Sequence, residues 1–127
     1  MKHKIIETDG APKAIGPYSQ AVKAGDFLFA SGQVGLDPAS GKLVGESIED
    51  QTRKSLVNLK AILTAGGAAL EDVVETTIFL TDIGDYATVN RIYSGFMGGH
   101  KPARVTVQVA ALPLRAKIEI KMTAFLG

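Results

Sequence analysis

The stretch PARVTVQVAALPLRAKIEIKMTAF, from Pro102 to Phe125, decides the fold of this chain. Its first half alternates apolar and polar side chains, with valines at 105, 107 and 109 on one side and Arg104, Thr106 and Gln108 on the other. Its second half repeats the pattern, with Ile118, Ile120 and Met122 opposite Lys117, Glu119 and Lys121. A period of two is typical of half-buried strands, so we expect two strands, joined as neighbours by a loop at 112–114. Arg104 and Glu119 would then share one region of the sheet, which favours a small carboxylate-binding reaction site.

Length and charge limit the classes of protein to consider. The chain has 127 residues, of which 46% are hydrophobic, enough for one compact domain and too few for two. We therefore expect a single domain over residues 1–127. The formal net charge is +1 and no run of lysines or arginines occurs in the sequence, so nucleic acid is not favoured as a partner.

The residue types that bind metals are scarce. The sequence has no cysteine, which excludes a disulfide framework, a thiol nucleophile and a thiolate metal site. Its two histidines, His3 and His100, show no ligand spacing, so we expect no metal. His100 lies in a glycine loop, where we expect an exposed side chain without a catalytic role. No apolar leader or membrane-length run is present, and we expect a cytoplasmic protein without membrane contact.

The first half of the chain predicts strands followed by a helix. Residues 5–7 suggest a short edge strand, and residues 21–23 and 27–31 suggest a hairpin that Gly32 and Gly35 end. Ser47 followed by Asp50 resembles a capping box. The helix behind it has an apolar stripe and ends at a glycine pair, with the stripe formed by Thr52, Leu56, Leu59 and Leu63 and the pair by Gly66 and Gly67.

The second half predicts a strand over residues 73–80 and a helix over residues 82–96, before the two final strands. The apolar stripe of this second helix consists of Val89, Ile92, Tyr93 and Phe96. The order of elements predicts an α+β domain with two helices on one face of a sheet. Because two helices cannot cover both faces, we expect the open face to pack against other copies of the chain in a homo-oligomer.

Several motifs together resemble a known family. They are IGPYSQA at 15–21, ASGQ at 30–33, PAR at 102–104, VAALP at 109–113 and IEI at 118–120, with Asn90 and Tyr93 between them. In this order they resemble the Rid family of reactive intermediate deaminases, also called the YjgF family. The resemblance implies a chorismate-mutase-like fold and a homotrimer whose sheets form an inner barrel, with ligand clefts between subunits. It also implies cofactor-independent hydrolysis of 2-imino acids, such as 2-iminobutanoate and 2-iminopropanoate, to 2-keto acids and ammonia.

The resemblance also implies roles for particular residues. Arg104 would hold the substrate carboxylate, since an arginine fork binds it bidentately. Glu119 would orient the attacking water and take its proton, and Tyr18 would donate a hydrogen bond to the substrate nitrogen. Ser31 would be a secondary contact, and the backbone at Thr106 would complete the carboxylate cradle.

Asn90 would hold the surrounding loops. Two positions depart from the family pattern: Thr106 stands where many relatives have cysteine, and Lys101 where relatives often have an aromatic residue. Thr106 excludes thiol chemistry at its position, and Lys101 leaves undetermined which substrate side chain the cleft prefers.

Other interpretations of the same residues remain. Arg104 fits a structural ion pair, Glu119 a solvated strand position between two lysines, and Tyr18 a loop anchor. At the level of function, the alternatives are a trimer that binds small carboxylates without catalysis and an endoribonuclease, an activity attributed to some members of the family. The sequence offers little support for the ribonuclease alternative, because it shows no clustered basic residues that would form an RNA-binding groove.

Overall fold

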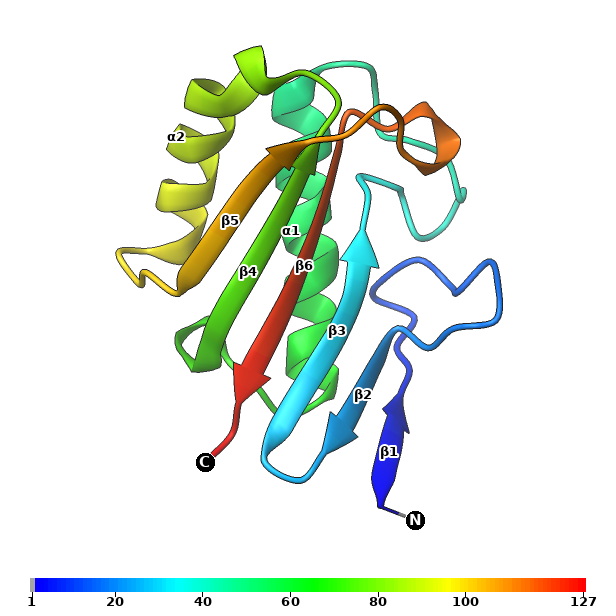
Figure 1. The fold of residues 1–127 in the computed structure, drawn as a ribbon. Helices are drawn as coiled ribbons and strands as arrows, with labels where there is room; N and C mark the ends of the chain where they lie inside the picture. The colour runs from blue at the N-terminus through cyan, green and yellow to red at the C-terminus, as the bar shows by residue number, and fades with distance from the viewer. Residues whose placement is uncertain (1) are drawn as a thin grey trace.

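A computed structural model describes residues 2–127 as one six-stranded mixed sheet with two helices on one of its faces (Figure 1). The strands are β1 His3–Ile6, β2 Ala21–Ala24, β3 Phe27–Gln33, β4 Val73–Leu80, β5 Ala103–Gln108 and β6 Ile118–Phe125. The helices are α1 Ile48–Ala65 and α2 Tyr86–Met97. The α+β class and the placement of both helices on one face are therefore confirmed.

The C-terminal stretch forms two strands as predicted, but they are not neighbours. The strand order is β1-β2-β3-β6-β4-β5, so β4 lies between β5 and β6. β6 pairs antiparallel with both β3 and β4, whereas β5 joins the edge of the sheet parallel to β4. The prediction of adjacency was wrong because α2 carries the chain from β4 to β5 as a crossover, and a crossover makes the two strands it links parallel partners.

The N-terminal hairpin and β4 agree with the sequence prediction, whereas other boundaries differ. β1 spans His3–Ile6 instead of residues 5–7, because its register places Ile6 opposite Ala21. Gly32 does not end β3, which continues to Gln33 through a shift of register against β6. The shift inserts one extra residue in β3, which is the definition of a β-bulge.

The two helices begin differently, since a side chain caps α1 but not α2. Ser47 caps α1 as predicted, since its side chain accepts a hydrogen bond from the backbone N–H of Asp50 at 3.0 Å. α2 starts at Tyr86, not at residue 82. The Asp82 carboxylate accepts a hydrogen bond from Gly84 N–H at 2.8 Å and holds residues 83–85 in a separate 3-10 turn, which is why the helix begins later.

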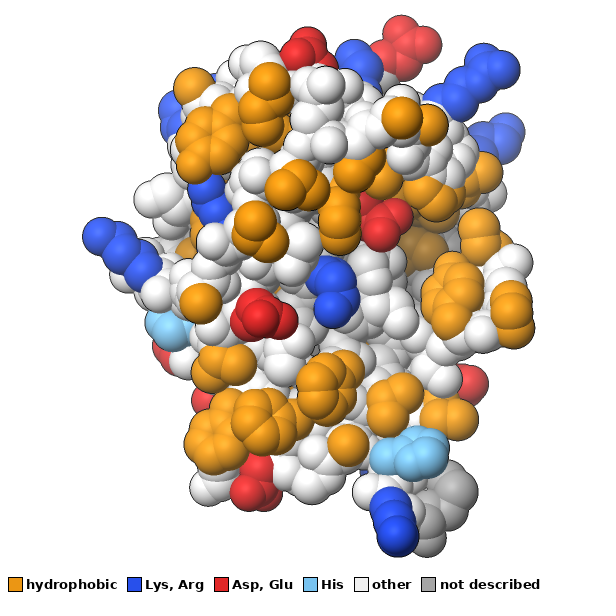
Figure 2. Space-filling view, viewed as in Figure 1, with side chains coloured by type: hydrophobic (Ala, Val, Ile, Leu, Met, Phe, Trp, Pro, Cys, Tyr) orange, Lys and Arg blue, Asp and Glu red, His pale blue; other side chains and the backbone are white. Residues whose placement is uncertain are grey.

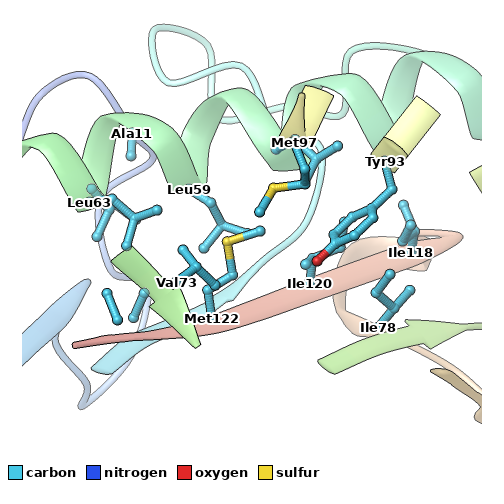
Figure 3. Packing of buried hydrophobic residues seen from close by; sticks show 14 of the residues in the cluster. Ala11, Leu59, Leu63, Val73, Ile78, Tyr93, Met97, Ile118, Ile120 and Met122 are labelled. Atoms are coloured by element: carbon cyan, nitrogen blue, oxygen red, sulfur yellow. The ribbon is translucent and has the colours of Figure 1, made fainter. Parts of the chain in front are cut away.

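The core lies between the sheet and the helices (Figure 3). Tyr93 and Met97 of α2 point toward the sheet, where Ile78 of β4 and Ile118 and Ile120 of β6 are buried. The predicted stripe of α1 is also buried, with Thr52, Leu56, Leu59 and Leu63 at most 1% exposed. The apolar face of each helix therefore packs where its period indicates.

The opposite face of the sheet carries apolar side chains without a covering element (Figure 2). Phe27 stacks obliquely on Phe29 and Phe125, with ring centroids 6.1 and 5.2 Å apart. The valines of β5 lie on this face, where Val105 is 52% and Val107 38% exposed, while Arg104 and Thr106 are partly covered. The half-buried strand expected at β5 thus has its apolar side open, because no part of residues 2–127 covers it.

Candidate functional site

The predicted site residues form two clusters on opposite faces of the sheet. Arg104 pairs with Thr76 of β4, and Glu119 pairs with Phe79. Thr76 and Phe79 are three residues apart on one strand, so their side chains point to opposite faces. Arg104 therefore lies on the helix side and Glu119 on the open side, and a single chain does not bring them together.

The Arg104 cluster is built by β5 and α2. The Arg104 guanidinium donates through Nη2 to Asn90 Oδ1 at 2.6 Å and to the Tyr86 hydroxyl at 3.2 Å. Its Cζ lies 5.1 Å from the ring centroid of Tyr93 and 5.7 Å from that of Tyr86, within range of cation–π attraction. These contacts fix the plane of the guanidinium and leave Nη1 and Nε without a side-chain acceptor among residues 2–127.

The positive charge of Arg104 is not neutralised by a carboxylate of the described chain. The ion pair found in residues 2–127 joins Arg53 to Asp50 at 3.9 Å, on the surface of α1. A hollow of about 310 Å³ adjoins Arg104, and His100, Lys101 and Pro102 line its rim. The structural ion pair considered for Arg104 is therefore not formed within the chain, and the hollow can receive an anion.

The pKa values of the two tyrosines around Arg104 are shifted in opposite directions. The neighbouring Asn90 side chain and then the Arg104 guanidinium lower the pKa of Tyr86. Burial raises the pKa of Tyr93, whose hydroxyl donates to Thr76 Oγ1 at 2.9 Å in the core. Tyr93 is thus a structural support, whereas the exposed Tyr86 accepts a hydrogen bond from Arg104 Nη2.

Glu119 lies in a second hollow, of about 360 Å³, on the open face of the sheet. Tyr18, Ser31 and Gly32 line it together with an apolar wall formed by Ile15, Val34, Leu36, Pro113 and Leu114. The carboxyl of Glu119 is half-buried, and burial alone raises its pKa above the ordinary value of 4.5. A carboxylate in this setting holds a proton more readily than a solvated one, as a general base or acid requires.

The two hydroxyls of this hollow have different hydrogen-bonding capacity. The Tyr18 hydroxyl accepts a hydrogen bond from Ile15 N–H at 3.2 Å, which leaves its own proton free to be donated. Ser31 donates its proton to the carbonyl of Ser19 at 2.5 Å, so that only its lone pairs remain for a ligand. Tyr18 is therefore the available donor and Ser31 an acceptor.

Comparison with known proteins assigns the chain to a family. The profile of the family described as Endoribonuclease L-PSP matches residues 8–126. The chain belongs to the Rid family, also called YjgF. The resemblance stated from the sequence motifs is thereby confirmed.

Relatives of this Rid protein include two deaminases. Reactive Intermediate Deaminase A, chloroplastic, from Arabidopsis thaliana is 52% identical over 126 residues, which cover 99% of this chain and 67% of the plant protein. The 2-iminobutanoate/2-iminopropanoate deaminase of Mus musculus is 48% identical over 124 residues, covering 98% of this chain and 92% of the mouse protein. Further relatives of similar identity are named only as RutC family proteins.

A solved structure of a relative contains an amino acid. The structure of E. coli TdcF with bound serine superimposes with a TM-score of 0.92 at 45% identity, covering 96% of this Rid chain and 98% of the other. The fold is therefore one in which a small amino acid has been observed bound.

The structure also shows polar residues of this Rid chain that sequence reasoning missed. Gln20 is buried and clamps the N-terminal loop: its side chain accepts from Thr8 N–H at 2.7 Å and donates to the carbonyls of Thr8, Ala11 and Pro12. This clamp holds the loop that carries Ile15 and Tyr18 into the Glu119 hollow. Gln20 belongs to the IGPYSQA motif, but its role depends on a loop path that the motif does not reveal.

A second set of missed residues lies on α1. Ser55 donates to the carbonyl of Gln33 at 2.6 Å, and Asn58 donates to that of Leu36 at 2.9 Å. Gln51 joins two segments, donating to the carbonyl of Gly45 and accepting from Lys117 N–H at 2.8 Å. The signal was present in the sequence, since positions 51, 55 and 58 have helical spacing, but polar side chains at that spacing usually indicate a solvated face.

Thr106 and His100 are the two remaining residues of interest. Thr106 Oγ1 is buried without a hydrogen-bond partner, on the helix side of β5. His100 was expected to be exposed, but it is partly buried and its Nε2 lies 2.7 Å from the carbonyl oxygen of Val73, because the loop after α2 folds back against the start of β4. No group of three His, Asp or Glu side chains in residues 2–127 has the arrangement of a metal site. Neither described helix has the length and apolar character needed to cross a bilayer.

Proposed function

We propose that this Rid protein hydrolyses reactive 2-imino acids and their enamine tautomers, including 2-iminobutanoate and 2-iminopropanoate, to 2-keto acids and ammonia. The observation that carries the proposal is the Arg104 guanidinium, held by Asn90 and Tyr86 beside a hollow and not neutralised by any carboxylate among residues 2–127. The deaminase names of relatives at about half identity support the same reaction.

In this reaction Arg104 binds the substrate carboxylate. The contacts with Asn90 and Tyr86 use Nη2, so the N–H groups of Nη1 and Nε remain to donate to the ligand. Charge-assisted hydrogen bonds from these N–H groups orient the carboxylate as well as bind it. The backbone at Thr106, two residues further along β5, completes the cradle in this proposal.

Glu119 and Tyr18 act on the C=N bond. The protonated imine carbon is attacked by water, which forms a C–O bond and gives up one proton to the Glu119 carboxylate. The nitrogen of the carbinolamine takes up the proton held by Glu119, and its C–N bond breaks as the hydroxyl gives up its proton through Glu119 to the departing ammonia. One protonated imine and one water thus yield one keto acid and one ammonium ion. Tyr18 donates its free proton in a hydrogen bond to the lone pair of the carbinolamine nitrogen, and the Ser31 oxygen accepts a hydrogen bond from an N–H of the same nitrogen.

We propose that the complete site forms between copies of the chain, in a homotrimer. Arg104 and Glu119 lie on opposite faces of one sheet, so one copy has to supply the arginine half and another the glutamate half. The uncovered apolar side chains of Phe29, Val105 and Val107 support an interface on the open face, since exposing apolar side chains to water is unfavourable in free energy.

The test couples the protein to a threonine dehydratase and follows 2-ketobutyrate formation where spontaneous imine hydrolysis is slow. Wild type is expected to accelerate the reaction and Arg104→Ala to lose the acceleration, whereas Arg91→Ala, an exposed arginine on α2, is the matched control and retains it. Absence of acceleration by wild type would refute the proposed function.

Mixing two inactive variants tests the shared site. Arg104→Ala and Glu119→Gln are each expected to be inactive, but subunits exchanged at equal ratio should regain activity in about a quarter of the sites, since each site draws its two halves from different copies. A mixture that remains inactive, after exchange is shown by mass spectrometry, contradicts the two-copy site.

A non-catalytic carboxylate-binding protein is the second candidate, favoured by the relative whose structure contains bound serine. The two candidates differ at Glu119. Loss of turnover in Glu119→Gln with retained binding of 2-ketobutyrate supports the enzyme. Binding in wild type without any turnover supports the binding protein.

A further inference from the structure

Gly32 lies where β3 bulges against β6, beside the hollow that holds Glu119. Ala30 pairs with Met122 and Gln33 with Ile120, so Ser31 and Gly32 share one position of the partner strand. The backbone at Gly32 does not need a glycine, because its φ lies outside the left-handed region. The reason for a glycine at this position is therefore space and not conformation.

That space is occupied by the side chain of Glu119. A Cβ added at position 32 would lie 2.9 Å from Glu119 Cδ and 3.0 Å from its Cγ, and closer still to Oε2. Two other glycines, Gly35 and Gly66, leave room for the Gln51 backbone and the Leu28 side chain, which are packing contacts of the fold. At Gly32 the missing side chain leaves room for an ionisable group.

We propose that Gly32 is a positioning residue: its missing side chain creates the recess that holds the Glu119 carboxyl against the backbone of β3, between Tyr18 and Ser31. This inference rests on the proposed function for its catalytic meaning. The recess itself is a property of the fold. It fixes where the carboxyl lies relative to a substrate and how much of it water reaches.

The charged surroundings of Glu119 are independent of Gly32. Lys13 and Tyr18 are the other titratable groups of the hollow, and Glu119 has Lys117, just before β6, and Lys121, on β6, two residues away on either side. The paired residue on β4 is Phe79, and the adjoining residues of β3 are uncharged. A substitution at Gly32 therefore changes the burial and place of the carboxyl without changing a neighbouring charge.

Gly32→Ala is the decisive variant. The atoms in its way belong to the far part of the Glu119 side chain, so the protein should fold and the carboxyl should move out of the recess. A displacement of about 1 Å costs up to roughly 100-fold in rate, so we expect kcat to fall between about 10- and 100-fold with little change in KM. Gly95→Ala is the matched control, since a Cβ at Gly95 meets no atom within 4 Å, and it should keep wild-type turnover.

A titration makes the outcome independent of turnover. The carboxyl carbon of Glu119, assigned with Glu119→Gln and followed by carbon-13 NMR, should titrate at lower pH in Gly32→Ala than in wild type, because burial is what raises the pKa of Glu119. The acid limb of the kcat/KM profile should shift in the same direction. If wild type does not hydrolyse imines but the titration moves, the recess is confirmed and the proposed function fails. If wild type is active and Gly32→Ala changes neither turnover nor titration, the recess is refuted.

Measurements of the free energy of unfolding test the recess even if Gly32→Ala is too unstable for kinetic assays. If the recess exists, Gly32→Ala lowers the free energy of unfolding more in the wild-type background than in Glu119→Ala, where nothing fills the space. An equal loss of stability in both backgrounds overturns the proposal, because the added methyl group would then be in conflict with something other than Glu119.

Discussion

Replacing Asn90 by aspartate should weaken carboxylate binding while leaving the shape of the Arg104 cluster intact. Asn90 Oδ1 accepts from Arg104 Nη2 at 2.6 Å, and an aspartate has nearly the same shape with a negative charge at that oxygen. The arginine would then be neutralised from within its own chain. The ligand carboxylate, bound to the same guanidinium, would lie near a like charge.

The size of the effect follows from the charges. Anions on the two edges of one guanidinium lie about 6 Å apart, where repulsion amounts to about 0.7 kcal/mol at a dielectric constant of 80 and about 2.8 kcal/mol at 20. Since Arg104 is partly covered, we expect between about 1 and 3 kcal/mol, or roughly 5- to 150-fold weaker binding. Asn90→Ala removes one hydrogen bond and adds no charge, so it should cost about 1 kcal/mol and remain within roughly tenfold of wild type.

Calorimetric titration with 2-ketobutyrate measures this directly. The expected order of affinity is wild type, then Asn90→Ala, then Asn90→Asp, with the thermal stability of Asn90→Asp no lower than that of wild type. Added salt should narrow the gap between the two variants, because salt screens repulsion between charges. Equal affinity of Asn90→Asp and Asn90→Ala would refute the reasoning, since Asn90 would then act only by its shape.

Three further changes test other parts of the structure. Ser55→Ala removes the buried donor to the Gln33 carbonyl, so urea unfolding should show a loss of about 1–3 kcal/mol, and a loss below 0.5 kcal/mol would mean that another donor reaches that carbonyl. Because the pKa of Glu119 is raised in the folded protein, folding binds protons, and the contribution of Glu119 to stability falls as pH rises from about 4.5 through the folded pKa. Glu119→Gln should therefore be more stable than wild type at pH 7 and lose that advantage near pH 4. A pH-independent difference in melting temperature would contradict the raised pKa. Arg115 follows Leu114 in a turn where both have positive φ, so Arg115→Asn should stabilise the fold by roughly 0.5–1 kcal/mol, and no gain in urea unfolding would show that the turn carries no strain.

Local pattern was a reliable guide wherever one side of an element packs in its own chain. The apolar stripe of α1 and the inner face of β6 are buried as their periods indicate, and Ser47 caps the start of α1. β5 shows the limit of this reasoning. Its alternation of side chains was read correctly, but its valines lie on the open face, because period two states which residues share a face and not what covers that face.

The polar residues around the candidate site were the least predictable. Gln20, Ser55 and Asn58 are buried because each meets backbone carbonyl or N–H groups of segments that are distant in sequence. The free energy that makes such burial tolerable comes from those partners. A sequence shows the side chain but not the carbonyl that it will meet.

By its sequence alone this chain determined its family and its α+β class, and it indicated the residues of the candidate site, since these depend on motifs and periods that are local in the chain. Only the tertiary structure decided that β4 separates β5 from β6, and with it that Arg104 and Glu119 lie on opposite faces of one sheet. The tertiary structure also decided that Gly32 leaves room for a carboxyl. The physical reason is that strand order and close contacts depend on which backbones meet across the sheet, and no spacing within a single strand records its neighbour.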